Sequence, residues 1–297
     1  MKIETPTQIL VRRRASIGDV IMSTAVVREL KRMHGADAVI DVATDNISVY
    51  RNNPHIRNIF PVDTASADQY DVYINLDNAY ENNPENNYID SYFNRAFGTT
   101  HFDKSVELFP STEDKEKVNA DLSDGTIGKF IVVHMRNWHW PAKNISMATW
   151  FSIYEKLFTA RTDFKVVCVG GPTDFFIEDH PLFVDARTKY NEQQLKYLCD
   201  QSRAFVGIDS GPYWCAAASN THIVALLTHL LPGRILPYRA HELGFNCTAA
   251  PTQEDCGGCN DHQRRPVSQI VCAKGNTPCN DNFNTVAIAQ AILDQLQ

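Results

Sequence analysis

The segments IGDV (17–20) and IDSGPYWCAAA (208–218) decide the fold, because each forms a glycine-centred turn between an apolar run and a helix-like segment. In the first segment, Gly18 allows a tight bend and Asp19 places a carboxylate at the tip of the turn. We expect the two turns to form opposing walls of one cleft.

The second turn has the composition of an anion-binding site. Ser210, Gly211 and the residues just after Pro212 would present free backbone N–H groups at a helix start, where the helix dipole also favours a phosphate. Pro212 itself has no N–H group to donate. The pair of turns therefore predicts an anion on one side of the cleft and a base supplied from the other. The structural alternative is that Asp209 or Ser210 acts only as a helix cap.

The composition is that of an ordinary globular protein of 297 residues, 43% of them apolar, and this length favours two domains. A formal net charge of −7 argues against broad attraction to nucleic acid, although the arginines at 12–14 could meet phosphates locally. No apolar run approaches the roughly 20 residues that span a bilayer, and the three arginines are unlike a signal peptide. We therefore expect a cytoplasmic protein without a membrane span, whose eight cysteines are mostly thiols or metal ligands.

Apolar strand-like runs alternate with amphipathic helical patterns, as in parallel sheets covered by helices on both faces. In the first half this pattern predicts a helix over 19–33 and strands at 9–11, 39–43 and 70–76, followed by an irregular loop with a short helix over 78–94. In the second half it predicts strands at 129–135, 164–171, 204–209 and 222–227 and helices over 147–159, 192–200 and 286–296, with turns after Pro237. The segment DLSDGTIG (121–128) is the best domain boundary, because its Gly, Ser and Asp content breaks both periodicities.

Four segments resemble the heptosyltransferases of glycosyltransferase family 9, and the resemblance covers most of the chain. They are ILVRRRASIGDVIMSTAVVRELKRMHGADAVIDVAT (9–44), HMRNWHWPAKNISMATW (134–150), VGGPTD (169–174) and VGIDSGPYWCAAASNTHIVALL (206–227). The resemblance implies an α/β protein of GT-B architecture, in which two Rossmann-like domains place their parallel sheets on either side of a cleft.

The same resemblance implies an inverting glycosyltransferase. An N-terminal acceptor domain would comprise residues 1–122, and residues 127–297 would form a nucleotide-sugar domain with a Cys-rich metal finger at 247–280 and a terminal helix. The enzyme would move a sugar, heptose by family default, from a nucleotide diphosphate sugar, ADP-linked by default, to an acceptor hydroxyl. A lipopolysaccharide core sugar, a protein hydroxyl and a modified DNA base all remain open as acceptors.

Glycosyl transfer requires a base for the acceptor hydroxyl and cationic or N–H groups for the leaving diphosphate. Asp19 is the candidate base, with a helix N-cap as the alternative. The resemblance gives Lys143, seven residues before Trp150, a diphosphate contact that replaces a divalent cation, so no catalytic metal is expected. Without the resemblance, Lys143 would be interpreted as a solvated loop lysine.

Other candidates would bind the donor. Arg136 follows a strand and is a second phosphate clamp or a surface ion pair, because a guanidinium can pair two oxygens at once. Asp174, where the family has an acidic residue for the ribose, is a ribose acceptor or another helix cap. The full set of expected donor-binding residues is Gly18, Arg136, Asp174, Asp209, Ser210, Gly211 and Pro212.

Two positions depart from the family pattern. Trp214 stands where many members carry a histidine, and Asp174 is one methylene shorter than the usual glutamate. A different nucleotide or a smaller sugar would be compatible with these changes. The aromatic cluster at 138–140 could offer a stacking face to a sugar or base, or simply pack internally.

The C-terminal region contains Cys256, Cys259, Cys272 and Cys279, in which a CxxC pair precedes two more widely spaced cysteines. Four thiolates in a tetrahedral arrangement would hold a structural Zn or Fe ion. The pattern is similar to the metal-binding cysteine motif of the autotransporter heptosyltransferases, where iron is held. Two disulfides or free thiols are the alternatives, and Cys247 or His262 could replace one ligand.

A different class of function is a catalytically silent module that binds a nucleotide sugar or a protein and uses the cysteine region for interaction. Turnover of a donor distinguishes the two. A Rossmann-type oxidoreductase is disfavoured, because no GxGxxG follows the first strand.

Overall fold

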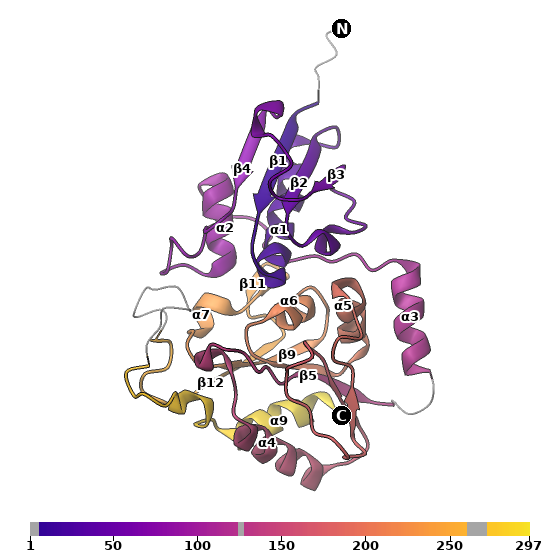
Figure 1. The fold of residues 1–297 in the computed structure, drawn as a ribbon, viewed down its shortest axis with the longest axis vertical. Coiled ribbons are helices and arrows are strands. Elements are labelled where there is room, and N and C mark those ends of the chain that lie inside the picture. Colours follow the sequence, from indigo (N-terminus) through magenta and orange to yellow (C-terminus); the bar gives the residue numbers. More distant parts are fainter. Residues whose placement is uncertain (1–5, 124–127, 260–271) are drawn as a thin grey trace.

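The computed structural model describes residues 6–123, 128–259 and 272–297. Two groups of strands, each with its own helices, follow one another along the chain (Figure 1). The first group comprises β1 (Gln8–Arg13), α1 (Ile17–His34), β2 (Val39–Thr44), η1 (Ile47–Tyr50), β3 (Asn58–Phe60), η2 (Ala67–Gln69), β4 (Val72–Asn75), α2 (Tyr88–Phe97) and α3 (Thr112–Leu122).

The second group runs from β5 to α9. Its elements are β5 (Phe130–His134), η3 (Pro141–Lys143), α4 (Met147–Ala160), β6 (Lys165–Cys168), β7 (Phe183–Asp185), α5 (Glu192–Gln201), β8 (Ala204–Gly207), α6 (Gly211–Ala217), β9 (His222–Leu227), α7 (Pro232–Ile235), β10 (Tyr238–Arg239), β11 (Glu242–Leu243), β12 (Cys247–Pro251), η5 (Pro278–Asn280) and α9 (Thr285–Gln295).

Both large sheets in the described residues are parallel. The first has the strand order β3-β2-β1-β4, and the second has the order β12-β9-β8-β5-β6-β7. In each sheet the order reverses beside the first strand, between β1 and β4 and between β5 and β8. Ligands of open α/β sheets bind at such reversals, beyond the carboxyl ends of the strands.

Alternate residues of β5 explain how the second sheet is covered on both faces. Phe130 and Val132 belong to one buried cluster, whereas Ile131 and Val133 belong to another that includes α4 and α9. The first cluster also contains residues of α1, α5, α6 and the first sheet. Figure 1 shows α5 and α6 between the two sheets and α4 with α9 on the far side of the second sheet. One apolar core therefore joins the two halves of the molecule.

Hydrogen bonds reinforce this junction. The Gln193 side chain on α5 donates to the carbonyl oxygen of Val49 at 2.9 Å. On α2, the N-cap residue Asn87 donates to the carbonyls of Gly233 and Leu236, both at 3.1 Å. The first contact joins α5 to η1, and the second joins the start of α2 to α7 and the residue that follows it.

The predicted strands and helices are present, with ends shifted by a few residues, but several further elements were not expected. The region after Pro237 was expected to hold turns and cysteines, yet β10 pairs with β11, and β12 pairs in parallel with β9 as an edge strand. Helices α3 and α7 and strands β3 and β7 were not predicted. The predicted domain boundary at 121–128 begins within α3, and residues 124–127 lie outside the described part of the chain.

Among the residues that the structure describes, we find no helix with the length and apolarity that a membrane crossing requires.

Candidate functional site

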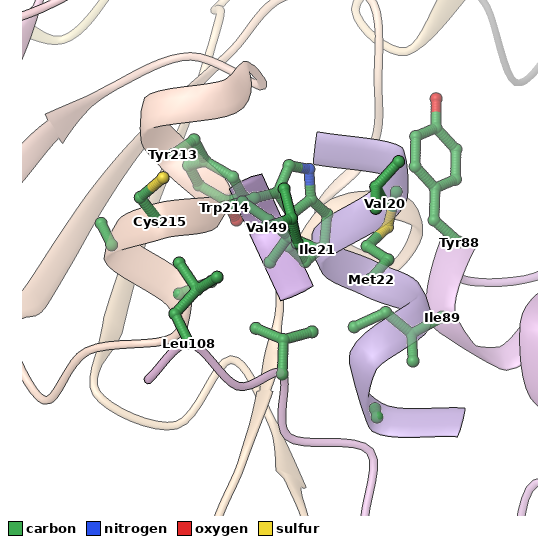
Figure 2. Packing of buried hydrophobic residues seen from close by; sticks show 14 of the residues in the cluster. Val20, Ile21, Met22, Val49, Tyr88, Ile89, Leu108, Tyr213, Trp214 and Cys215 are labelled. Carbon is green, nitrogen blue, oxygen red and sulfur yellow. The ribbon is translucent and has the colours of Figure 1, made fainter. Parts of the chain in front are cut away.

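The β1–α1 turn and the β8–α6 turn are in direct contact. A Cβ atom added to Gly18 would lie 2.6 Å from Cδ1 of Trp214, and one added to Gly211 would lie 3.5 Å from Ile17. Trp214 is 1% exposed, and Figure 2 shows its ring between α6 and α1, near Ile21. The two turns were expected to form opposing walls of one cleft. They meet, but the buried indole fills the space between them, and Gly18 and Asp19 do not line an open cleft.

A pocket of about 430 Å³ opens beside this contact, a volume typical of small-ligand sites. Ser16 and Ile17 contribute one wall, and the carboxyl ends of β5, β6 and β8 contribute another. Five of the predicted site residues line it: Arg136, Asp174, Ser210, Gly211 and Pro212. Lys143, Asp209, Gly18 and Asp19 lie outside its lining.

His134, at the end of β5, connects two of these predicted residues. Its Nδ1 atom lies 2.9 Å from Oγ of Ser210, and its Nε2 atom lies 3.0 Å from Oδ2 of Asp174. Burial raises the pKa of Asp174, but hydrogen bonds led by that from His134 outweigh it, so the pKa is below its usual value. No role of His134 was predicted from sequence, although its place at a strand end, two residues before Arg136, was a signal for one.

Asp174 also accepts hydrogen bonds from two backbone groups. Oδ2 accepts from the N–H of Gly171 at 2.7 Å, and Oδ1 accepts from the N–H of Asn137 at 2.8 Å. The carboxylate therefore fixes the loops after β5 and β6 relative to each other, and Oδ1 retains a lone pair toward further donors.

Asp209 forms a second charged cluster behind the pocket. Its Oδ2 accepts from Nζ of Lys143 at 2.8 Å, and its Oδ1 accepts from Nε1 of Trp214 at 3.2 Å. Arg136 donates to the backbone carbonyl of Asp209 at 2.7 Å. Burial raises the pKa of Asp209, but the charge and hydrogen bond of Lys143, followed by the charge of Arg136, hold it below its usual value.

His229 lies in the same buried cluster. Its Nδ1 atom is 3.0 Å from the carbonyl oxygen of Ala142, beside Lys143. Burial, followed by the positive charge of Lys143, lowers the pKa of His229 to about 3. The imidazole is therefore neutral, and its Nδ1–H donates to the carbonyl.

Asp19 is 7% exposed, and its contacts come from its own half of the molecule. Oδ1 accepts from the hydroxyl of Tyr80 at 2.7 Å and pairs with Arg13 at 3.0 Å, and Oδ2 accepts from the N–H of Ser16 at 3.0 Å. Asp19 thus completes a capping box with Ser16 at the start of α1. Burial, followed by the charge of Asp19, raises the pKa of Tyr80 well above its usual value, so this hydroxyl stays a donor.

Arg13 is fixed more tightly than an ordinary ion-pair partner. It is 1% exposed, with the centre of its guanidinium 5.4 Å and 5.2 Å from the rings of Tyr80 and Tyr92. It also donates to the carbonyl of Leu76 at 3.0 Å. Arg13 was expected from sequence only as a local phosphate contact, but it is the buried ion-pair partner of Asp19.

Trp138 and His139 are the exposed members of the aromatic cluster at 138–140, and Trp138 borders the pocket. Trp138 is 42% exposed and lies over the guanidinium of Arg136, whose centre is 5.0 Å from the ring. Asn144 accepts from its N–H at 2.8 Å and donates to its carbonyl at 2.7 Å. A flat apolar surface is therefore held at the rim of the pocket.

The cysteine region is partly described. Cys279 is buried, and burial followed by the neighbouring Cys259, Cys256 and Cys272 raises the pKa of its thiol to about 12. Among the described residues, the group whose ligand atoms lie within 4.8 Å of one another is Glu254, Asp255 and Cys256. His262, the substitute ligand considered above, lies outside the described residues, and Cys247 lies in β12.

Two parallel sheets whose strand reversals face each other, with a pocket at that junction, constitute the GT-B fold of glycosyltransferases. The chain is similar to a glycosyl transferase family 9 protein from Veillonella parvula, with 18% identity over 99% of each chain and a TM-score of 0.71. It is also similar to the ADP-heptose lipopolysaccharide heptosyltransferase II of Escherichia coli, with 15% identity over 97% of this chain and 98% of that one, and a TM-score of 0.69.

A third similar structure is the iron-containing dodecameric glycosyltransferase TibC from enterotoxigenic E. coli, with 14% identity, all of this chain and 78% of that one covered, and a TM-score of 0.73. TibC was also solved in complex with ADP-D-β-D-heptose. No protein-family model and no curated protein sequence matches the chain. At these identities the likeness establishes the fold.

Proposed function

We propose that this protein is an inverting glycosyltransferase that moves a sugar from a nucleoside diphosphate sugar to an acceptor hydroxyl. The observation that carries the proposal is the pocket at the junction of the two strand reversals, where a guanidinium, a serine hydroxyl and a carboxylate converge. Those groups match a donor that has a diphosphate and a ribose. The similar solved structures are glycosyltransferases, which supports the same reaction class.

In this proposal the donor diphosphate lies against Arg136, Ser210 and Gly211, and Asp174 contacts the ribose. Pro212 lines the same pocket, whereas Gly18 allows the first turn to pack closely against Trp214. Lys143 would leave Asp209 to neutralise the leaving diphosphate, so that no divalent cation is needed. Asp209 acts through Lys143 and is a positioning residue.

Asp19 is the proposed base. Its Oδ2 atom accepts one backbone hydrogen bond, which leaves a lone pair for the proton of the acceptor hydroxyl. Arg13 and Tyr80 hold Oδ1, so the carboxylate cannot rotate away during the reaction. The first 122 residues, including the aromatic region around α2, would provide the acceptor site.

ADP-heptose is the first donor to test, because TibC was solved in complex with it and the similar E. coli enzyme is an ADP-heptose heptosyltransferase. The acceptor stays open between a lipopolysaccharide core sugar, a protein hydroxyl and a modified DNA base. A thermal-shift screen of nucleotide sugars narrows this choice, since the donor restricts the class of acceptor.

Cys256, Cys259, Cys272 and Cys279 are proposed to hold a structural Zn or Fe ion. The three other cysteines contribute to the raised pKa of buried Cys279, which supports the proposal, and a four-thiolate set suits either metal. The ion would stabilise the fold between β12 and α9. Stoichiometric metal in anaerobically purified protein, lost together with thermal stability in Cys256→Ser, supports this site; elemental analysis without Zn or Fe contradicts it.

The decisive experiment compares Asp19→Asn with Asp114→Asn. Both carboxylates complete a capping box, at the starts of α1 and α3. If Asp19 is the base, its variant loses about 10²–10⁴-fold in transfer while the donor binds as before, whereas Asp114→Asn retains transfer. The silent binding module is favoured if the wild-type protein binds the donor but does not turn it over. In that case Asp19→Asn and Asp114→Asn should also bind the donor equally well.

A further inference from the structure

Asp174, His134 and Ser210 form a continuous hydrogen-bonded chain that ends at the pocket. His134 is 4% exposed and Ser210 is 6% exposed, and both line the pocket. The proposed contacts with the donor do not use the histidine. Its two ring nitrogens nevertheless determine which way the hydrogen of the Ser210 hydroxyl points.

The directions of these hydrogen bonds follow from the available protons. Asp174 is an ionised carboxylate that only accepts, so Nε2 of His134 carries a hydrogen. In a neutral imidazole, Nδ1 is then an acceptor, and it takes the hydroxyl hydrogen of Ser210 at 2.9 Å. The remaining lone pairs of Ser210 Oγ face the N–H of Tyr213, 3.3 Å away. With a neutral histidine, Ser210 therefore has no hydrogen to offer a phosphate oxygen.

The imidazole ring has little room to relieve this conflict by rotating. A Cβ atom on Gly170 would lie 2.8 Å from Cδ2 of His134, and one on Gly207 would lie 3.4 Å from its Cβ atom. Both glycines thus lie close to the His134 side chain. A Ser210 hydroxyl that rotated toward an anion would leave Nδ1 of His134 without a donor. The response that keeps both ring hydrogen bonds is a change in protonation: an Nδ1–H would donate to Oγ of Ser210 and release the hydroxyl hydrogen toward the pocket.

Charge balance favours that response. The ring of His134 pairs with Asp174, and Asp209, Arg136 and Lys143 form the neighbouring cluster, so the formal charges of these two carboxylates and two cations cancel. Glu192, at the start of α5, adds a further carboxylate to the lining of the pocket. A bound diphosphate adds at least two negative charges to this low-dielectric cluster. A proton on His134 would be attracted both to the diphosphate and to Asp174.

We infer that His134 takes up a proton from solvent when a diphosphate binds, and thereby converts Ser210 from a closed hydroxyl into a donor toward the ligand. His134 acts through Ser210 and is a positioning residue. The inference rests on the proposed function, because it concerns the diphosphate of the same donor. The ligand class is a nucleoside diphosphate or inorganic pyrophosphate.

Isothermal titration calorimetry of the full chain with ADP and with inorganic pyrophosphate tests this, using buffers of different ionisation enthalpy. Titrations at roughly pH 7.5–9 keep ADP ionised, since the last pKa of a phosphate ester is near 6. Inorganic pyrophosphate retains a proton over much of this range, so its titrations are made at the lower end and compared between wild type and His134→Asn. Proton uptake is expected when either ligand binds. The affinity of the protein for the ligand should then fall by up to tenfold for each unit by which the pH is raised. Pyrophosphate has no ribose, so the result does not depend on the proposed ribose contact of Asp174.

In His134→Asn, a side-chain amide replaces Nδ1 with a permanent donor, so proton uptake and the pH dependence should both disappear. His222→Asn is the matched control, because His222 also has two hydrogen-bond partners, Asn246 and Thr248, but lies away from the pocket. This control should retain the proton uptake of the wild type.

If His134→Asn does not fold, nitrogen NMR of histidine-labelled wild-type protein gives the same answer. The His134 ring should change from the Nε2–H tautomer to the imidazolium when pyrophosphate is added. ADP binding without proton uptake, or with equal uptake in His134→Asn, overturns the inference and leaves the transferase proposal intact. A wild-type protein that binds pyrophosphate but no nucleoside diphosphate contradicts the transferase proposal instead, and one that binds neither contradicts both.

Discussion

Each half of the molecule buries a carboxylate in its glycine turn, but the two are held by different cations. Asp19 pairs with Arg13, whose guanidinium lies between two tyrosine rings and is bound to a backbone carbonyl. Asp209 pairs with Lys143, a compact ammonium on a flexible stem. The first carboxylate is thus held by a buried, fully bonded partner, whereas the second is paired with a flexible side chain that, in the proposed function, moves to the ligand.

The largest expected effect comes from removing the ammonium group of Lys143. Lys143→Met leaves Asp209 as a buried unpaired charge, so we expect a loss of about 3–5 kcal/mol in unfolding free energy. In Lys143→Met with Asp209→Asn, most of this stability should return, while transfer stays about 10²–10³-fold below wild type. Denaturant unfolding and initial-rate measurements separate the two effects. A single variant as stable as the wild type would mean that the pair is dispensable.

A smaller effect on stability is expected when alanine replaces the glycine of each turn. Gly18→Ala places a methyl group 2.6 Å from the buried indole of Trp214, so it should lower the unfolding free energy by about 1–3 kcal/mol. Gly211→Ala meets Ile17 at an ordinary 3.5 Å and should change the free energy by less than about 1 kcal/mol. Thermal and denaturant unfolding of both variants provides the check, and equal losses would contradict the tight contact.

A smaller effect concerns the pH dependence of stability at the Asp209 cluster. The pKa of His229 is lowered from 6.5 to about 3, so the folded state keeps it neutral while the unfolded chain protonates it. The contribution of neutral His229 to the unfolding free energy is complete above pH 6.5. It is lost as the pH falls toward 3, by up to about 1.4 kcal/mol per pH unit. His229→Asn should therefore reduce the slope of unfolding free energy against pH in this window. A slope identical to that of the wild type and of His222→Asn would count against a neutral buried His229.

The alternation of strands and helices could be predicted because strands buried on both faces are continuous apolar runs, as in KFIVVHM and HIVALL. Strand β12, CTAAP, was missed because it is a partly exposed edge strand of small residues with no such run. Helix α3 is mostly charged and carries little apolar periodicity. Its capping box, Ser111 to Asp114, was the signal that could have found it.

The candidate site divides in the same way. Glycine turns and strand ends are local features, so Arg136, Ser210 and Gly211 could be placed on the pocket from sequence. The partners of Asp19 could not, because Tyr80 follows a different strand and meets Asp19 only when β4 pairs with β1. His134 gains its role through Asp174, which likewise approaches it only in the folded sheet.

The close contact between Gly18 and Trp214 has an evolutionary consequence. Where related sequences keep a bulky aromatic residue at 214, position 18 should remain glycine, and where that aromatic is replaced by a smaller side chain, position 18 becomes free to vary. Positions 18 and 214 should thus change together, although they lie far apart in the sequence.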